Sequence, residues 1–182
     1  MRSPGSMTSL VRCLAIAAVV VGSPAARAEP DAPTDVIATQ PLALVARGVS
    51  VSYERPLTDR LSAAALGGFR AAALGDYGST TGTAGAELHV WLRRSSVLRG
   101  PYLGLHVSAG YTRLTDDVMG YAGASTGLTQ RIDIGWRFVV HRHLTITPSL
   151  GLGCREDIDM RGQLATTTRG MAAIGLEVGW MR

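Results

Sequence analysis

The stretch VSVSYERPLTDRLSAAA, residues 49–65, alternates apolar and polar side chains, halts at ERPLTDR and then begins a second apolar-rich run. Alternation with a period of two is typical of a β-strand that has one apolar and one polar face. The stretch therefore predicts two antiparallel strands joined by a tight turn. In the first strand one face carries Ser50, Ser52 and Glu54, and the other carries Val49, Val51 and Tyr53.

The same period continues to the end of the chain. It is found in HVWLRR, YLGLHVSAGYTR, QRIDIGWRF, LTITPSLGLGCR and AAIGLEVGW. Each segment places apolar residues at every second position, with Gly, Ser, Thr or a charged residue between them. No segment after residue 28 shows a convincing amphipathic helix of three turns, so the pattern predicts an all-β fold.

The segments between these runs are of two kinds, which alternate along the chain. ERPLTDR, RSSVLRGP and VHRH are short or compact, whereas GDYGSTTG, TDDVMGYAGASTG and EDIDMRGQLATTT are longer, polar and rich in glycine. Short turns at one end and long loops at the other are typical of an outer-membrane barrel. The predicted strands are 36–45, 49–54, 61–72, 83–93, 102–113, 128–139, 144–155 and 168–181. We therefore predict an eight-stranded antiparallel up-and-down transmembrane β-barrel.

The first two strands allow an alternative, in which residues 36–54 form one long strand bent at Gly48. That would give seven strands and place the two chain ends on opposite sides of a membrane. Single-chain bacterial barrels have an even number of strands, which favours eight. Pro41 cannot donate to a strand ladder and indicates an irregular first strand.

The first 28 residues have the pattern of a secretory signal peptide. Arg2 and Arg12 precede the apolar run CLAIAAVVVG, and SPAARA follows it. Small residues at Ala26 and Ala28 fit cleavage after Ala28. The sequence thus predicts a signal peptide over 1–28, a single β-barrel domain over 29–182, and export to the outer membrane of a Gram-negative bacterium.

Composition narrows the classes of function. Without residues 1–28 the chain has 15 basic and 14 acidic residues, so a basic surface for nucleic acid is not indicated. Cys154 is then the one remaining cysteine, and it cannot form an internal disulfide. The domain must be held together by its core or by a membrane.

The alternation separates two faces along the predicted strands. The outward face carries Leu88, Val90, Leu92, Leu103, Leu105, Val107, Ile132, Ile134, Leu150, Leu152, Ile174, Leu176 and Val178. Charged residues lie between them and point inward. Because an eight-stranded barrel is just wide enough for side chains to fill it, these charges must neutralise one another and leave no open pore. The predicted interior polar network is Glu54, Glu87, Arg93, Arg131, Arg137 and Glu177.

Aromatic residues gather near the strand ends on the short-turn side, as an aromatic girdle at a membrane interface requires. The predicted girdle is Tyr53, Trp91, Tyr102, Trp136, Phe138 and Trp180. By alternation, however, Trp91 and Tyr102 point inward.

Other motifs are weak. His141 and His143 offer two imidazoles, fewer than a metal site needs. EDIDM, residues 156–160, lacks the glycine and terminal glutamate of a helix-loop-helix calcium site. No Ser/His/Asp arrangement stands in a helpful context. We therefore predict no catalytic, cofactor-binding or metal-binding residues, and no cofactor.

QPLALVARGVSVSYERPLTDRLS, residues 40–62, resembles the opening of an uncharacterised family of small eight-stranded bacterial outer-membrane barrels, which begins with an N-P-L-like stretch and a Y-E-R-x-L turn. The resemblance covers the first quarter of the chain after residue 28, and Gln40 stands where the family often has Asn. It implies a membrane barrel and no catalytic residues.

We expect a structural or interaction barrel rather than an enzyme, in contact with membrane lipids and, through its long loops, with extracellular molecules or lipopolysaccharide. One alternative is a lipid-modifying outer-membrane enzyme, which needs a nucleophile or base at the lipid edge. The other is a soluble, lipocalin-like periplasmic binder of a small apolar ligand, which needs a polar outer face.

Overall fold

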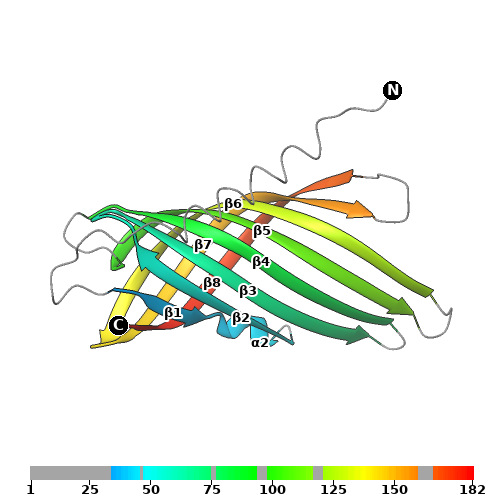
Figure 1. Cartoon of the computed structure of the whole chain (residues 1–182), viewed down its shortest axis with the longest axis horizontal. Helices are drawn as coiled ribbons and strands as arrows, with labels where there is room; N and C mark the ends of the chain where they lie inside the picture. The colour runs from blue at the N-terminus through cyan, green and yellow to red at the C-terminus, as the bar shows by residue number, and fades with distance from the viewer. Residues whose placement is uncertain (1–33, 46, 75–76, 94–97, 117–120, 160–165) are drawn as a thin grey trace, which may run out of the picture.

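Eight antiparallel strands form a closed barrel in the computed structural model, which describes residues 34–45, 47–74, 77–93, 98–116, 121–159 and 166–182 (Figure 1). The strands are β1 Val36–Thr39, β2 Gly48–Pro56, β3 Leu61–Leu74, β4 Tyr77–Trp91, β5 Gly100–Asp116, β6 Tyr121–His141, β7 Leu144–Asp159 and β8 Thr166–Met181. Each strand pairs with its neighbours in the sequence, and β8 pairs with β1. The predicted up-and-down barrel is confirmed. The predicted signal peptide lies outside the described residues.

The strands are staggered, as closure of a barrel requires. Starting at Val36 and stepping to the paired residue on each following strand leads once around the barrel to Met171 on β8. The direct partner of Val36 on β8 is Met181, ten residues further along. This offset tilts the strands against the barrel axis and brings inward side chains of successive strands to one level.

The first strand is shorter than predicted. β1 ends at Thr39, and the short helix α2, Pro41–Val45, follows it instead of a continued strand. Pro41 is the cause, because it has no N–H to donate to the ladder and its fixed φ suits the first position of a helix. Arg47, at a φ of 54°, then turns the chain into β2.

Because β1 is short, it closes only part of the barrel. Among the described residues, β8 pairs with β1 over Val178–Met181, and the rest of β8 pairs with β7 alone. Helix α2 contacts both β2 and β8 and lies beside this seam. Its exposed side chains Leu42, Leu44 and Val45 are apolar.

Most of the residues expected in long loops belong to strands. β4 begins at Tyr77, β6 at Tyr121 and β8 at Thr166, whereas β7 continues to Asp159. The polar, glycine-rich segments therefore extend the hairpins rather than interrupt them. Threonine accounts for part of this, because its β-branched side chain suits strands, and Thr81 and Thr112 also share a hydrogen bond of 3.0 Å across β4 and β5.

The outer face is apolar along the middle of the strands, from β2 around to β8. Large side chains there are about half exposed or more, up to 78% for Ile174. The exposed residues of this band are Val49, Val51, Val90, Leu92, Leu103, Leu105, Ile132, Ile134, Leu150, Leu152 and Ile174. Such a belt is the surface of a barrel that crosses a bilayer with its strands. None of the described helices is long and apolar enough to cross a membrane.

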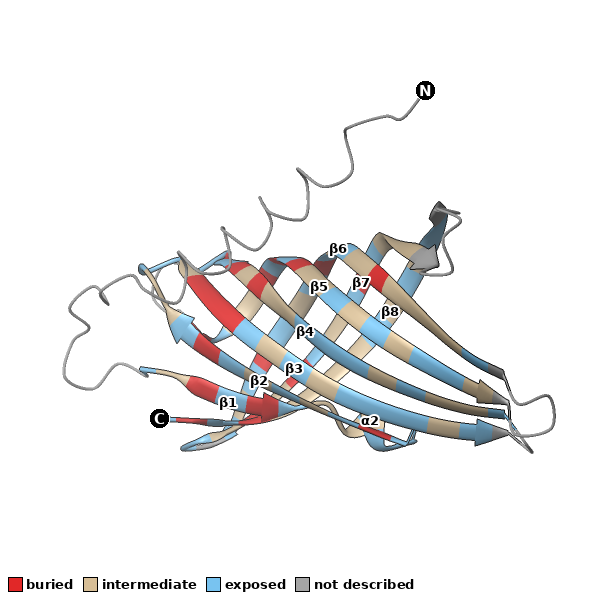
Figure 2. Ribbon diagram, turned by 45° about the vertical axis from the view of Figure 1, so that its right-hand side comes forward, coloured by how far each residue is buried: buried red, intermediate tan, exposed pale blue. Residues whose placement is uncertain are grey.

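The buried residues gather toward the end of the barrel that holds the C-terminus (Figure 2). An apolar cluster closes the interior there, with Trp91 and Leu98 fully buried. The cluster consists of Val36, Ala38, Trp91, Leu98, Tyr102 and Met181. Charged side chains, among them Glu54 and Arg137, lie directly beyond it.

Candidate functional site in the barrel interior

Glu54 on β2 is bonded on several sides inside the barrel. Its Oε2 accepts a hydrogen bond of 2.6 Å from Nη2 of Arg137, on β6 across the interior. Its Oε1 accepts a bond of 2.5 Å from the hydroxyl of Ser62 on β3. That hydroxyl in turn accepts a bond of 2.8 Å from the indole N–H of Trp91. A carboxylate with several donors is stable in a dry interior because its oxygens are satisfied.

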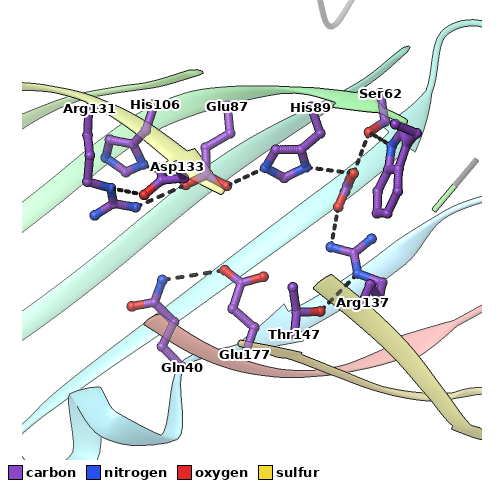
Figure 3. A network of polar contacts seen from close by, with 12 residues as sticks. Gln40, Ser62, Glu87, His89, His106, Arg131, Asp133, Arg137, Thr147 and Glu177 are labelled. Carbon is purple, nitrogen blue, oxygen red and sulfur yellow. Dashed lines mark hydrogen bonds and ion pairs between the residues drawn. The ribbon is translucent and has the colours of Figure 1, made fainter. Parts of the chain in front are cut away.

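His89 on β4 joins two carboxylates. Its Nδ1 lies 2.9 Å from Oε1 of Glu54, and its Nε2 lies 3.4 Å from Oε2 of Glu87. Carboxylates can only accept, so both ring nitrogens carry protons and the imidazole is positively charged. His89 thus connects Glu54 with Glu87, and Figure 3 shows the dashed contact between His89 and Glu87.

Glu87 also orients a second imidazole. Its Oε1 lies 2.5 Å from Nδ1 of His106, whose Nε2 lies 2.9 Å from Oγ of Ser108. His106 and Ser108 are two residues apart on β5, so both point inward. Glu87 and His106 are paired in the register of β4 and β5. The result is a linear carboxylate–imidazole–hydroxyl chain.

Arg131 and Asp133, both on β6, complete this group of charged side chains inside the barrel. Arg131 Nε lies 2.6 Å from Oδ1 of Asp133, and its Nη2 lies 3.8 Å from Oε1 of Glu87. The first contact is ionic rather than a hydrogen bond, because the Nε–H is not directed at that oxygen. Arginine therefore places its charge between two carboxylates.

Glu87, His106 and Asp133 could each offer one ligand atom to a metal ion, since these atoms lie within 4.8 Å of one another. Arg131, however, contacts both carboxylates, and its charge would oppose a cation there. The donor set is better suited to the ion pairs that it already makes.

Apart from His106 and Glu177, the side chains that these ion pairs join carry equal numbers of negative and positive groups. The negative groups are Glu54, Glu87 and Asp133, and the positive groups are Arg131, Arg137 and the protonated ring of His89. Balance matters because an uncompensated charge in a dry interior costs several kcal/mol.

Glycines on neighbouring strands make room for these large side chains. A Cβ on Gly135 would collide with the ring of Tyr102, and one on Gly151 would collide with the Asp133 carboxylate and Arg131. Large and glycine residues thus face each other across adjacent strands, and a side chain can lie flat over the neighbouring backbone.

The predicted polar network is placed as follows. Glu54, Glu87, Arg131 and Arg137 lie together in the interior. Glu177 also lies in the barrel, and its Oε1 accepts a hydrogen bond of 3.4 Å from Gln40.

The assignment of Arg93 to the interior is wrong. β4 ends at Trp91, so the alternation of faces stops before Arg93, whose side chain is exposed. Its guanidinium lies 5.8 Å from the centre of the Trp136 ring.

The predicted aromatic residues divide between the two faces. Tyr53, Trp136, Phe138 and Trp180 are exposed on the outer face, where Trp136 stacks with Phe138 at 5.9 Å and Trp180 with His143 at 5.2 Å. Trp91 and Tyr102 are buried inside, 5.2 Å apart. These two rings belong to the buried apolar cluster because they stand on inward positions of β4 and β5.

The sequence did not indicate Ser62 or Ser108 as parts of the site. Ser62 lies beside Glu54 only because the turn at ERPLTDR pairs β2 with β3. Ser108 had a signal, since His106 and Ser108 share one face of a strand. The pairing of Glu87 on β4 with His106 on β5 could not be predicted from either strand alone.

No protein-family model and no curated protein matches the chain. Among solved structures, the crystal structure of Ail, the attachment invasion locus protein of Yersinia pestis, aligns with 82% of this chain and 97% of its own. The identity is 10% and the TM-score is 0.45. This likeness is too distant to bear on function.

Proposed function

We propose that this chain is an outer-membrane β-barrel with a structural or interaction role, exported by the signal peptide predicted over 1–28. The observation that carries the proposal is the contrast between the two faces of one sheet. The outer face exposes the apolar band, including Leu105, Ile134 and Ile174, whereas the inner face buries balanced charges. A lipid environment stabilises this inverted arrangement, and water would not.

The opposite arrangement would suit a soluble lipocalin-like binder, whose outer face must be polar. A contiguous apolar belt of this size on a soluble protein would cause aggregation. The lipid-modifying enzyme required a base at the lipid edge, but His89 and His106 both lie inside. These observations favour the barrel with a structural or interaction role.

We expect no passage for solutes through the barrel. Trp91 and Leu98 close the end that holds the C-terminus, and the ion pairs of Glu54 and Arg137 fill the next layer. Partners at the other end, whether extracellular molecules or lipopolysaccharide, would meet the described ends of the strand pairs β3–β4, β5–β6 and β7–β8.

Fractionation of a two-membraned bacterium that expresses the full chain tests the proposal. We expect the protein in the outer-membrane fraction, extracted by detergent only, with a gel mobility that changes on boiling. Recovery in the soluble periplasm would contradict it. Planar-bilayer recordings of the extracted protein should show no stable conductance above that of the empty bilayer, and a steady open channel would refute the filled interior.

A further inference from the structure

The chain Glu87, His106 and Ser108 has the order of atoms that activates a serine for acyl transfer. A carboxylate oxygen lies 2.5 Å from Nδ1, and the hydroxyl lies 2.9 Å from Nε2 of the same ring. The distance of 2.9 Å between Oγ and Nε2 falls within the range for a nucleophile and its base. The arrangement is recognised by geometry and not by residue order in the chain.

The protonation of the chain also fits. Glu87 can only accept, so in the neutral ring the proton of His106 stands on Nδ1 and Nε2 is free to accept from the Ser108 hydroxyl. In this tautomer the ring can take up the serine proton on Nε2 as a base.

Ser108 stands where the interior becomes accessible. Glu87 and His106 are buried, Ser108 is half-buried, and Thr83, on an inward position nearer the long hairpins, is exposed. The register partners of Ser108 are Gly85 on β4 and Thr129 on β6, and both are small. Neither neighbouring strand therefore places a large side chain directly beside Ser108.

We propose that Ser108 is a nucleophile toward small carboxylic esters that enter the barrel from the hairpin end, with His106 as its base and Glu87 as a positioning residue. Oγ bonds to the carbonyl carbon while its proton passes to Nε2 of His106. The ester bond then breaks, and the alkoxide leaves with that proton as an alcohol. Water attacks the acyl-serine through the same base and releases the carboxylic acid.

The test uses the full chain, expressed in a two-membraned host and extracted in detergent. A small alkyl fluorophosphonate is the first probe, because its phosphorus bonds to an activated serine and releases fluoride. Intact mass and peptide mapping report the modified residue. Hydrolysis of p-nitrophenyl acetate is the second probe.

We expect one adduct, on Ser108, and its complete loss in Ser108→Ala. His106→Gln should slow labelling by roughly 10²-fold or more, since it removes the base. Glu87→Gln should slow it as well, whereas Glu87→Asp should retain part of the rate, because an aspartate still orients the imidazole. Ser125→Ala is the matched control: Ser125 also occupies an inward, half-buried position, on β6, and its removal should change neither rate.

Heat-modifiable gel mobility establishes that each variant is folded before it is compared. The proposal is overturned if the folded wild-type protein takes no label, if the label persists in Ser108→Ala, or if His106→Gln is labelled as fast as wild type. The first of these outcomes would mean that the Ser108 hydroxyl only fixes the ring of His106.

Discussion

Replacement of Glu54 by glutamine keeps the size of the side chain and removes its charge. In the wild type its carboxylate lies 2.6 Å from Arg137 and 2.9 Å from His89, and all three side chains are buried. The variant would leave both cations without this partner. Removal of one member of a buried pair costs ~3–5 kcal/mol, so the free energy of unfolding should fall by about that amount.

The comparison with an exposed pair makes this figure specific. Arg155 and Asp157 form an ion pair of similar length, 2.8 Å, but their side chains are 41% and 32% exposed. Solvent screens such a pair, and Arg155→Gln should therefore change the free energy of unfolding by less than ~1 kcal/mol. The two variants differ mainly in the burial of the charge that they leave behind.

Urea unfolding of the barrel in lipid vesicles, followed by tryptophan fluorescence, measures both losses. The Trp91 ring lies 5.2 Å from the Arg137 guanidinium and so reports on this part of the interior. Addition of Arg137→Met to Glu54→Gln should recover part of the loss, with a coupling energy of at least about 1 kcal/mol. Equal small losses in Glu54→Gln and Arg155→Gln, or strict additivity in the double variant, would refute a structural ion pair and the strand register behind it.

Two further substitutions test the two faces. Ile134→Arg puts a charge on the outer apolar band and should lower the free energy of unfolding in vesicles by ~2–4 kcal/mol. Thr115→Arg, on the outer face of β5 two residues past the native Arg113, should lower it by less than ~1 kcal/mol. Equal losses would show that the band is misplaced. Gly135→Ala should cost ~1–3 kcal/mol because its methyl group meets the Tyr102 ring, whereas Gly82→Ala meets no atom within 4 Å and should be close to neutral. If the midpoint of thermal unfolding fell as much for Gly82→Ala as for Gly135→Ala, the packing of Tyr102 against Gly135 would be wrong.

The strand pattern could be read from the sequence because its signal is local. Alternation in 49–54 and 128–139 marks both the strands and their faces, and the short turns mark the hairpins. The helix at 41–45 was missed because PLALV has too few residues for a helical period to appear. The loop lengths were overestimated because Gly, Ser and Thr are typical of loops and also line the water-facing ends of long hairpins.

The site was only partly predictable, for a different reason. Inward charges such as Glu54 and Arg137 could be found from alternation, but their pairing depends on the stagger of the whole barrel. Ser62, Ser108 and Asp133 join the site because the register of neighbouring strands brings their side chains, or those of their partners, beside Glu54 and Glu87. The prediction for Arg93 was wrong because the alternation was extended two residues past the end of β4.

The short pairing of β1 with β8 has a consequence for the order of assembly. From β2 to β8 the paired strands are adjacent in sequence and form long ladders. Each pair can therefore form with little loss of chain entropy, because only a short segment separates its strands. Closing the ring instead joins residues near 36 to residues near 181. Among the described residues it gains the short pairing of Val178–Met181 with β1 and two backbone hydrogen bonds between Arg182 and residues 34 and 35. We therefore expect closure to be the last step of folding and the barrel to open first along this seam, where α2 rather than a strand contacts the next part of β8.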